Sequence, residues 1–406
     1  MTRAGQTSPF VAIACGGTGG HLFPGLAVAE QLVARGCSVA LLVSPKEVDQ
    51  QAVKSARGME IITLPAVGLQ NGNYFSFARG FWQSWRAARK IFHARPPRAA
   101  LAMGGFTSAP PILAARGVGA RTFLHESNTI PGRANRWLAG FVDQAFVGFP
   151  QTAERLQTRE ITVTGTPVRA EFCHSDAAVC RAALGLDSAK PVLLVTGGSQ
   201  GASGINDLIL SALPLLAKRA PHWQWLHLTG PNDFEKVKEA YAALNLKAVV
   251  HPFLAEMNTA LGAATAAVSR AGASSLAELA AMRLPSLLVP FPHAADDHQL
   301  HNARAFEQTG AAQLLEQKDA TSEKVTELLI DLMENTATRI TMQPALAQWH
   351  APQAAEQIAE VILRAASETV TGKKSSKLQA SASGETSTSN RRFALGSSAL
   401  GFHAYD

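Results

Sequence analysis

The sequence has little of what marks a secreted, zinc-binding or membrane-spanning protein. Its 406 residues include only four cysteines, and none forms a Cys-x-x-Cys pair or accompanies histidines at zinc-ligand spacing. No stretch reaches the roughly 18–20 apolar residues that are needed to cross a bilayer. The short apolar run at residues 10–14 leads directly into glycines, which is not a signal-peptide pattern. We therefore expect a protein of the reducing cytosol or of a membrane surface.

Acidic residues are missing from residues 61–125, although this stretch carries eight Arg or Lys residues and many aromatic ones. Several of these aromatic side chains are spaced for one face of a helix, with basic residues beside that face. The composition is typical of a surface that binds anionic lipid, and it also fits an amphipathic helix packed on a sheet. We expect no nucleic acid partner, because no nucleic-acid-binding motif accompanies the stretch. The expected membrane contacts are Phe75, Phe81, Trp82, Trp85 and Arg86.

Apolar runs separated by helical patterns make up most of the chain, which is 47% hydrophobic and 17% charged. Continuous apolar runs between helices predict parallel strands covered on both faces. Two successive series predict an α/β protein with two Rossmann-like, doubly wound parallel-sheet domains, joined near residues 167–175. A Ser- and Thr-rich composition from residue 367 onward predicts a disordered tail. The expected strands are residues 11–14, 39–43, 99–103, 122–125, 144–147, 192–196, 223–228, 248–251, 266–268 and 286–289, and the expected helices include residues 24–34, 205–217 and 353–364.

A glycine-rich turn, residues 16–21, follows the first expected strand and precedes a helix. Glycines let main-chain amides approach an anion, and a helix N-terminus favours negative charge. The turn is neither a Walker A loop nor a dinucleotide-binding fingerprint, because the spacing of its glycines fits neither motif. His21 ends the turn at the carboxyl edge of the sheet, so it is a candidate general base. A tight turn without ligand and a histidine with no catalytic role fit the same spacing.

The second series of strands carries loops of the same kind. Residues 196–202 form a second glycine-rich turn, in which Ser199 is placed to donate to a phosphate oxygen. Small residues at positions 272–275 leave room for phosphate at the start of another helix. Glu278 follows one turn later, where its carboxylate either accepts from a ribose diol or simply favours the helix dipole.

Polar loops follow other strands of both series. Glu126 lies in a loop of the first series and is a second candidate base. Arg169 lies near the expected domain junction, where it either reaches toward phosphate or is an ordinary surface residue. Residues 290–299 are dense in His and Asp, which suits sugar hydroxyls. We expect no metal ion there, because the order of these residues matches no standard ligand spacing.

Seven segments in this order closely resemble the MurG family of N-acetylglucosaminyltransferases. They are GGTGGHLFPGLAVAE, GGFTSAP, HESN, GTPVR, TGGSQGA, SRAGASSLAELA and PFPHAADDHQLHNA. The resemblance extends from about residue 11 to about residue 364 and leaves out the Ser- and Thr-rich tail. Within it, Phe106 replaces a common Tyr and Ala109 a common Gly. Each segment alone is weakly specific, but all seven in order are strongly so.

The resemblance implies a GT-B fold, in which two Rossmann-like domains face each other across a cleft. It implies an acceptor- and membrane-binding domain at residues 1–168, a UDP-sugar-binding domain at residues 169–349, and a helix at residues 350–366 that returns to the first domain. Residues 367–406 remain the predicted tail. No cofactor is expected. The residues expected at UDP-N-acetylglucosamine are Thr18, Gly19, Gly20, Asn128, Arg169, Ser199, Leu254, Ala273, Ser274, Ser275, Leu276, Glu278, His298 and Gln299, and those expected at the acceptor diphosphate are Gly16, Gly17, Gly104 and Gly105.

The implied reaction is one inverting displacement in peptidoglycan synthesis. The 4-hydroxyl of an undecaprenyl-diphosphate-linked muramoyl-pentapeptide attacks the anomeric carbon, and UDP leaves. We assign the general base to His21, with Glu126 as the alternative. The expected location is the cytoplasmic face of the cell membrane, as a peripheral protein with other cell-wall synthesis proteins as candidate partners. Rival hypotheses are another GT-B transferase acting on a lipid glycoside or diglyceride, a non-catalytic scaffold that retains a nucleotide pocket, and a nucleotide-dependent oxidoreductase.

Overall fold

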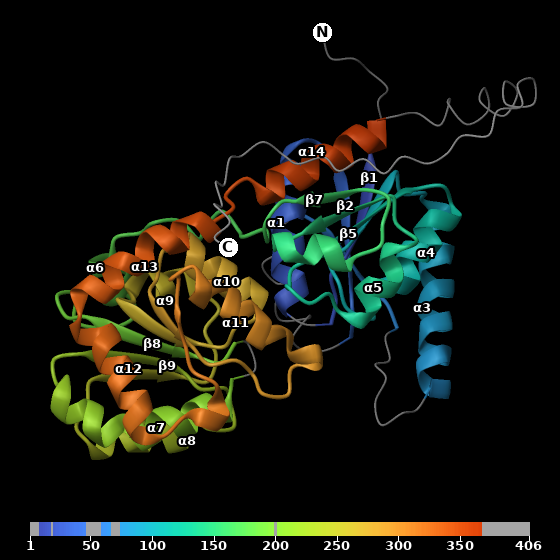
Figure 1. The fold of residues 1–406 in the computed structure, drawn as a ribbon. Helices are drawn as coiled ribbons and strands as arrows, with labels where there is room; N and C mark the ends of the chain where they lie inside the picture. Colours follow the sequence, from blue (N-terminus) through green and yellow to red (C-terminus); the bar gives the residue numbers. More distant parts are fainter. Residues whose placement is uncertain (1–7, 18, 46–57, 66–73, 199–200, 368–406) are drawn as a thin grey trace, which may run out of the picture.

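The computed structural model describes residues 8–17, 19–45, 58–65, 74–198 and 201–367 of the chain. These residues fold into two α/β domains that lie side by side, each built around one parallel sheet (Figure 1). This confirms the predicted fold class. Most of the predicted tail lies outside the described residues.

The first domain contains a seven-stranded sheet in the order β3-β2-β1-β4-β5-β6-β7. The strand order reverses direction between β1 and β4, and ligands of such sheets bind beyond the carboxyl ends of the strands at that point. The strands are β1 (Phe10–Ala14), β2 (Ser38–Val43), β3 (Glu60–Thr63), β4 (Ala99–Ala102), β5 (Arg121–Glu126), β6 (Gln144–Val147) and β7 (Ile161–Val163).

Helices cover both faces of this sheet. On one face α1 and α14 pack together, and Leu22 and Leu26 share a buried core with Ile358 and Ile362. On the other face α3 packs against α4, and Ala88 and Phe92 are fully buried there. The helices are α1 (Gly19–Ala34), α3 (Tyr74–Ala94), α4 (Ala109–Gly117), α5 (Arg133–Ala139), the 3-10 helix η2 (Pro150–Arg155) and α14 (Ala354–Ser367).

The second domain contains a six-stranded sheet in the order β10-β9-β8-β11-β12-β13. Its reversal lies between β8 and β11, so the loops that follow these two strands meet at one edge. The strands are β8 (Val192–Thr196), β9 (Gln224–Leu228), β10 (Ala248–His251), β11 (Ala266–Ser269), β12 (Ser286–Leu288) and β13 (Gln313–Leu314). The helices are α6 (Ala177–Ala183), α7 (Ser203–Arg219), α8 (Phe234–Ala243), α9 (Met257–Ala263), α10 (Ala273–Ala281), α11 (His298–Gln308), α12 (Ser322–Glu334) and α13 (Thr336–Trp349), with the 3-10 helices η3 (Ala295–Asp297) and η4 (Gln317–Asp319).

The chain crosses between the domains twice. It leaves the first domain after β7 along residues 164–176, and it returns after α13 to form α14 on the first domain (Figure 1). At the two crossings, a Cβ atom on Gly165 would lie only 2.3 Å from Cβ of Ala351, so the two strands of chain touch. The second domain is therefore continuous in sequence, whereas the first is built from two segments.

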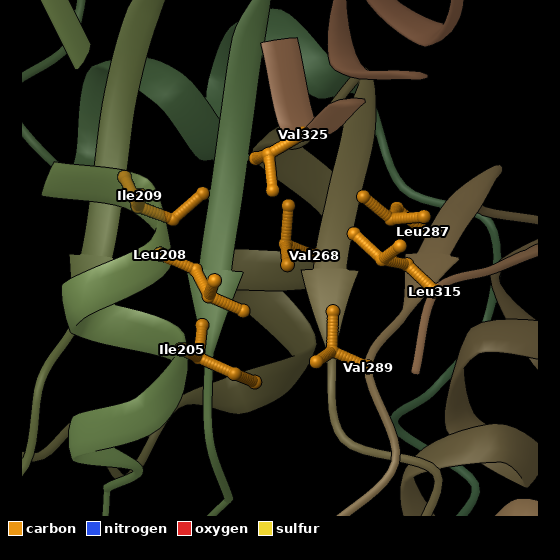
Figure 2. Close-up of a pocket in the computed structure, with 8 residues that line it drawn as sticks. All are labelled: Ile205, Leu208, Ile209, Val268, Leu287, Val289, Leu315 and Val325. Atoms are coloured by element: carbon orange, nitrogen blue, oxygen red, sulfur yellow. The ribbon is translucent and has the colours of Figure 1, made fainter. Parts of the chain in front are cut away.

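The core of the second domain is closely packed. A small apolar cavity between α7, α12 and strands β11 and β12 encloses about 10 Å³ (Figure 2). Such a space is barely large enough for one water molecule, and its aliphatic lining offers no polar partner. The cavity is therefore a packing defect rather than a ligand site. Its lining side chains are Ile205, Leu208, Ile209, Val268, Leu287, Val289, Leu315 and Val325.

Sequence patterns predicted the central strands to within one or two residues but missed β3, β7 and β13. These three lie at edges of the sheets, and each has exposed or half-buried positions. The first helix was also placed too late, because it begins at Gly19 instead of at Pro24. Its first turn therefore contains the candidate base His21.

Candidate active site at the domain interface

The loops that follow β1 and β4 bring two predicted motifs together around His21. A Cβ atom built on Gly104 would lie 2.8 Å from Cε1 and 2.9 Å from Nδ1 of His21, and one on Gly105 would lie 3.4 Å from Nε2. The imidazole ring therefore rests against a main chain that has no side chains. Gly104 also has a φ of 114° and Gly105 one of 77°, values that favour glycine. The sequence GG at this point is what allows His21 its place at the edge of the sheet.

Gly16 and Gly17 complete this edge. A Cβ atom on Gly16 would collide with the amide nitrogen of Ser44 at 2.5 Å, so the turn passes directly over the end of β2. Thr107 donates from Oγ1 to the carbonyl oxygen of Gly16 at 2.6 Å, which ties the turn to the loop after β4. The four glycines expected at the acceptor diphosphate therefore lie close together at this edge of the sheet. Thr18, in the same turn, lies outside the described residues.

A cross-domain hydrogen bond joins this turn to the second domain. Oγ of Ser274, in the first turn of α10, donates to the carbonyl oxygen of Gly20 at 2.9 Å. Within an α-helix that oxygen would accept from the N–H of residue 24, but Pro24 has none. Proline inside α1 thus leaves an acceptor for the second domain. The helix start formed by Ala273, Ser274, Ser275 and Leu276 consequently lies beside His21's helix.

The carboxylate of Glu126, the alternative base, is surrounded by hydrogen-bond donors. Its Oε1 accepts from the main-chain N–H of Asn128 at 2.9 Å and from Nδ2 of Asn128 at 3.0 Å. Its Oε2 accepts from the N–H of Gly132 at 2.9 Å and from Nδ2 of Asn135 at 2.7 Å. The residue is only 2% exposed. Four donors and deep burial make this carboxylate an anchor for the loop that leads into α5.

His125, which sequence analysis did not single out as a separate site, is buried beside Glu126. Its Nε2 donates to the carbonyl oxygen of Gly165 at 3.1 Å, so Nδ1 accepts from Oγ of Ser127 at 3.2 Å. Burial lowers the pKa of His125 to about 4, which keeps the ring neutral at physiological pH. The side chain fastens the end of β5 to the first crossing between the domains.

Arg169 and Glu278, which were expected at the diphosphate and the ribose, lie close enough to interact electrostatically. Burial raises the pKa of Glu278 to about 7; Arg169 opposes this effect and Glu171 adds to it. Burial likewise raises the pKa of Glu30, in α1, and Arg169 again opposes the effect. Arg169 therefore lies among carboxyl groups from both domains and from the crossing.

The guanidinium of Arg169 makes several contacts, but one of its nitrogen atoms has no hydrogen-bond partner in the part of the chain that the structure describes. It pairs with Glu171 at 2.8 Å and stacks over Phe23 and Phe172, 4.5 and 5.1 Å from the ring centres. Its Nε is buried and has no hydrogen-bond partner among the described residues. A buried donor without a partner is costly, so this nitrogen is suited to an anionic ligand.

Asn302, a residue of α11 that sequence analysis did not single out, bridges the domains next to Asn128. Its Oδ1 accepts from the N–H and from Oγ1 of Thr129, both at 2.9 Å. Its Nδ2 donates to Oδ1 of Asn128 at 3.0 Å and to the carbonyl oxygen of Ala271 at 3.1 Å. The predicted sugar contact Asn128 is thereby fixed from both sides.

The loop before α11 carries the other predicted sugar contacts. Nδ1 of His298 bonds to the carbonyl oxygen of Ala295 at 2.8 Å, and Oε1 of Gln299 accepts from the N–H of Phe291 at 3.0 Å. Leu254, expected at the uracil, is half-buried against the core of the second domain. Ser199 lies outside the described residues.

A buried network supports the end of the second glycine turn. Nδ2 of Asn206 donates to the carbonyl oxygen of Thr229 and to Asp233, so its Oδ1 accepts from Nε2 of His227 at 3.0 Å. Nδ1 of the same ring then accepts from the hydroxyl of Tyr241 at 3.1 Å. Burial lowers the pKa of His227 to about 3, so the ring stays neutral. The network fixes Thr229, against which Gly201 packs so closely that a Cβ atom would lie 2.3 Å from its carbonyl oxygen.

The exposed side of α3 carries the predicted membrane contacts. Phe75 is 80% and Trp82 52% exposed, whereas Phe81 and Trp85 are half-buried. Arg86 stacks over Trp82, 5.2 Å from the ring centre. Trp137 of α5 extends this surface, although sequence analysis did not select it. Its side chain is 49% exposed, and its ring centre lies 6.4 Å from that of Phe81. Basic and aromatic groups therefore share one face of the first domain.

None of the helices in the described residues is both long and apolar enough to cross a membrane. Within the same ranges, no three His, Cys, Asp or Glu side chains converge as ligands of a metal ion.

Two facing Rossmann-like domains, with the glycine turn before α1 and the start of α10 meeting at their interface, are the arrangement of the GT-B fold. Residues 11–147 match the glycosyltransferase family 28 N-terminal domain, and residues 192–358 match the family 28 C-terminal domain. The chain belongs to the MurG family of these enzymes.

Relatives and solved structures agree on this assignment. A protein of Anaeromyxobacter dehalogenans (strain 2CP-C) is 36% identical over 86% of this chain and 91% of its own length. One from Geobacter sp. (strain M21) is 37% identical over 84% and 93%. Both are named UDP-N-acetylglucosamine–N-acetylmuramyl-(pentapeptide) pyrophosphoryl-undecaprenol N-acetylglucosamine transferase.

Among solved structures, MurG of Acinetobacter baumannii superposes with a TM-score of 0.69 and 27% identity, over 88% of this chain and 100% of that one. A putative UDP-N-acetylglucosamine 2-epimerase from Listeria monocytogenes reaches a TM-score of 0.65 over 90% of this chain and 98% of its own, but only 16% identity. That second likeness shows the shared fold alone.

Proposed function

We propose that this chain transfers N-acetylglucosamine from UDP-N-acetylglucosamine to the 4-hydroxyl of a lipid-linked muramoyl-pentapeptide, with inversion at the anomeric carbon. The named activity of relatives that share more than a third of their residues supports this reaction. The observation that carries it is the junction of Ser274 with Gly20, because it sets the helix start of α10 beside the turn that bears His21.

The base in this reaction is His21. Its ring rests on Gly104 and Gly105 at the surface assigned to the acceptor diphosphate, together with Gly16 and Gly17. An acceptor held there presents its hydroxyl to an imidazole, the side chain that most often serves as a general base in enzymes. The four hydrogen bonds that Glu126 already accepts favour a positioning role for that carboxylate.

Departure of UDP requires that the growing charge on its diphosphate be neutralised. The start of α10 supplies main-chain N–H groups and a favourable dipole, and Arg169 supplies a guanidinium with an unused Nε. Glu278 accepts from the ribose, and the main chain at Leu254 contacts the uracil. The remaining donor contacts are assigned to Thr18, Gly19, Gly20, Asn128, Ser199, His298 and Gln299.

The same proposal assigns roles to the segments of the chain. Residues 1–168 with the helix at 350–366 bind acceptor and membrane, residues 169–349 bind the nucleotide sugar, and residues 367–406 form a tail outside both. The basic and aromatic face of α3 attaches the enzyme to anionic lipid at the cytoplasmic face of the membrane, where the acceptor and other cell-wall synthesis proteins are found.

A transfer assay tests the reaction. Labelled UDP-N-acetylglucosamine is incubated with the protein and a lipid-linked muramoyl-peptide, and label in the lipid product is measured. We expect label in the disaccharide lipid and none with a diglyceride acceptor. Binding of the nucleotide sugar without any labelled product would instead support a non-catalytic scaffold, and label in the diglyceride would support a different acceptor.

A further inference from the structure

One aspartate of the second domain pairs with two arginines of the first. Oδ1 of Asp296 lies 3.1 Å from Nη2 of Arg133, and Oδ2 lies 2.6 Å from Nη2 of Arg136. The hydrogen bond from Arg133 and the positive charge of both guanidinium groups hold the pKa of Asp296 below its ordinary value. The carboxyl group of Asp296 is therefore ionised at neutral pH, and its pairing with the two arginines spans the domain interface.

The main chain around Asp296 takes a conformation that needs such support. Asp296 and Asp297 have φ angles of 51° and 50°, so two successive residues with side chains are left-handed. Aspartate and asparagine tolerate this region better than most residues, yet it remains unfavourable for each. The two residues immediately precede His298 and Gln299, so their conformation sets where those side chains begin.

The two arginines lie on a helix whose start is fixed by hydrogen bonds. They lie three residues apart on α5, which places them on one side of that helix. The start of α5 is fixed by Glu126, which accepts from the N–H of Gly132 and from Nδ2 of Asn135. A series of contacts thus runs from the buried carboxylate of Glu126 in the first domain to the loop of the second.

We propose that Arg133, Arg136 and Asp296 form a cross-domain clasp that positions the loop bearing His298 and Gln299 for the sugar of the donor. The proposal rests on the proposed function, because it takes His298 and Gln299 as contacts of N-acetylglucosamine. Asp296 is a positioning residue, since it acts through the loop and not on the substrate. The clasp lies beside the Asn302 bridge, so the loop and α11 are fastened to the first domain at two points.

The affinities for UDP-N-acetylglucosamine and for UDP are compared to test this role. An effect on the sugar contacts changes only the first affinity, whereas a general disturbance of the site changes both. We expect Asp296→Asn to weaken binding of UDP-N-acetylglucosamine by no more than about fivefold, because ion pairs with exposed arginines are weak. Binding of UDP should stay within twofold of wild type, because the clasp acts on the sugar contacts. In turnover assays the KM for the donor should rise by the same factor while kcat and the acceptor KM stay unchanged.

Asp297→Asn is the matched control. Asp297 has the same backbone conformation, and asparagine is tolerated there, but no ion pair of Asp297 occurs among the described residues. This variant should bind the donor like wild type. Equal effects of Asp296→Asn and Asp297→Asn would overturn the proposal, because the ion pairs would then be irrelevant.

Substitutions of the arginines complete the test. Arg133→Gln with Arg136→Gln should weaken donor binding as Asp296→Asn does, and adding Asp296→Asn should have no further effect. Arg133→Lys with Arg136→Lys keeps the charges and should retain most of the affinity. Additive losses, or an equal loss of UDP binding, would refute the clasp. If wild type binds the donor but transfers nothing to the lipid acceptor, the proposed function fails while these binding comparisons still decide the clasp.

Discussion

Ser274 donates a hydrogen bond across the domain interface to the carbonyl oxygen of Gly20, 2.9 Å away. That oxygen is available because Pro24, four residues later in α1, has no N–H to offer it. Pro24, a residue type that ordinarily weakens a helix, therefore leaves an acceptor for a hydrogen bond from the second domain. The two domains therefore meet at the first turn of α1, next to His21.

His21→Ala should abolish most turnover while leaving donor binding almost intact. Loss of a general base typically lowers kcat by about 10²- to 10⁴-fold. The ring rests on Gly104 and Gly105 rather than in the second domain, so the KM for UDP-N-acetylglucosamine should change by less than about threefold. Steady-state kinetics with both substrates measures this, and near-normal kcat would remove His21 from the role.

Glu126→Ala should act mainly on stability. Its removal leaves four donors in a buried loop without their acceptor, which we expect to cost about 2–4 kcal/mol of unfolding free energy. Denaturant unfolding of wild type and variant measures the difference. Unchanged stability combined with a kcat as low as that of His21→Ala would make Glu126 the base after all.

Gly104→Ala should lower turnover by displacing His21. The added Cβ atom would lie 2.8 Å from the imidazole ring, at a φ of 114°. Gly119→Ala is the control, because Gly119 also has a positive φ, 88°, but no atom within 4 Å of the added carbon. Both variants should lose about 1 kcal/mol of stability from backbone strain. Only Gly104→Ala should lose kcat, and equal losses in both would show that strain alone matters.

The raised pKa of Glu278 predicts a pH dependence of both stability and donor affinity. The unfolded chain releases this proton near the ordinary value of 4.5 and the folded protein near 7. Between these values the folded state holds an extra proton, so the stability due to this group is complete below 4.5 and is lost as pH rises through 7. Glu278→Gln should remove this part of the slope in melting temperatures measured from pH 4.5 to 8.

Donor affinity should follow the opposite course. Only the ionised carboxylate of Glu278 accepts fully from a ribose diol, so the KM for the donor should rise as pH falls below 7. Glu278→Gln should show a high donor KM at every pH. A wild-type KM that is flat from pH 6 to 8 would contradict the ribose assignment.

Replacing Trp82, Trp85 and Arg86 by alanine should release the protein from vesicles that contain anionic lipid. Trp82 and Arg86 are exposed on α3, and Trp85 lies half-buried beside them. Leu215→Ala, Arg219→Ala and Ile340→Ala together remove a similar combination from the second domain and should leave vesicle binding unchanged. Co-sedimentation measures both, and persistent binding of the first variant would place the membrane surface elsewhere.

Sequence patterns were sufficient for the central strands because parallel strands buried on both faces are continuous apolar runs. They failed at β3, β7 and β13, which are short edge strands with partly exposed side chains, where burial no longer dictates the sequence. The start of α1 was misplaced for a local reason. Glycines 19 and 20 are poor helix formers and proline usually begins a helix, yet tertiary contacts extend α1 back to Gly19.

Contacts between candidate residues were predictable where two loops follow neighbouring strands, and not where the partner lies in the other domain. The contact of His21 with Gly104 followed from loops placed at strand ends, whereas the approach of Arg169 to Glu278 was expected only from the family resemblance. Asn302 and Asp296 lie inside a quoted segment, but their partners on the loop after β5 and on α5 are more than 150 residues away in sequence. Only the fold reveals such pairs.

The return of the chain to the first domain as α14 decides how the molecule would respond to force. A load applied between residues 8 and 367 acts on β1 and α14, which share one core, while both ends of the second domain are tied together at Gly165 and Ala351. The second domain therefore bears little of this load until the contacts between β1 and α14 break.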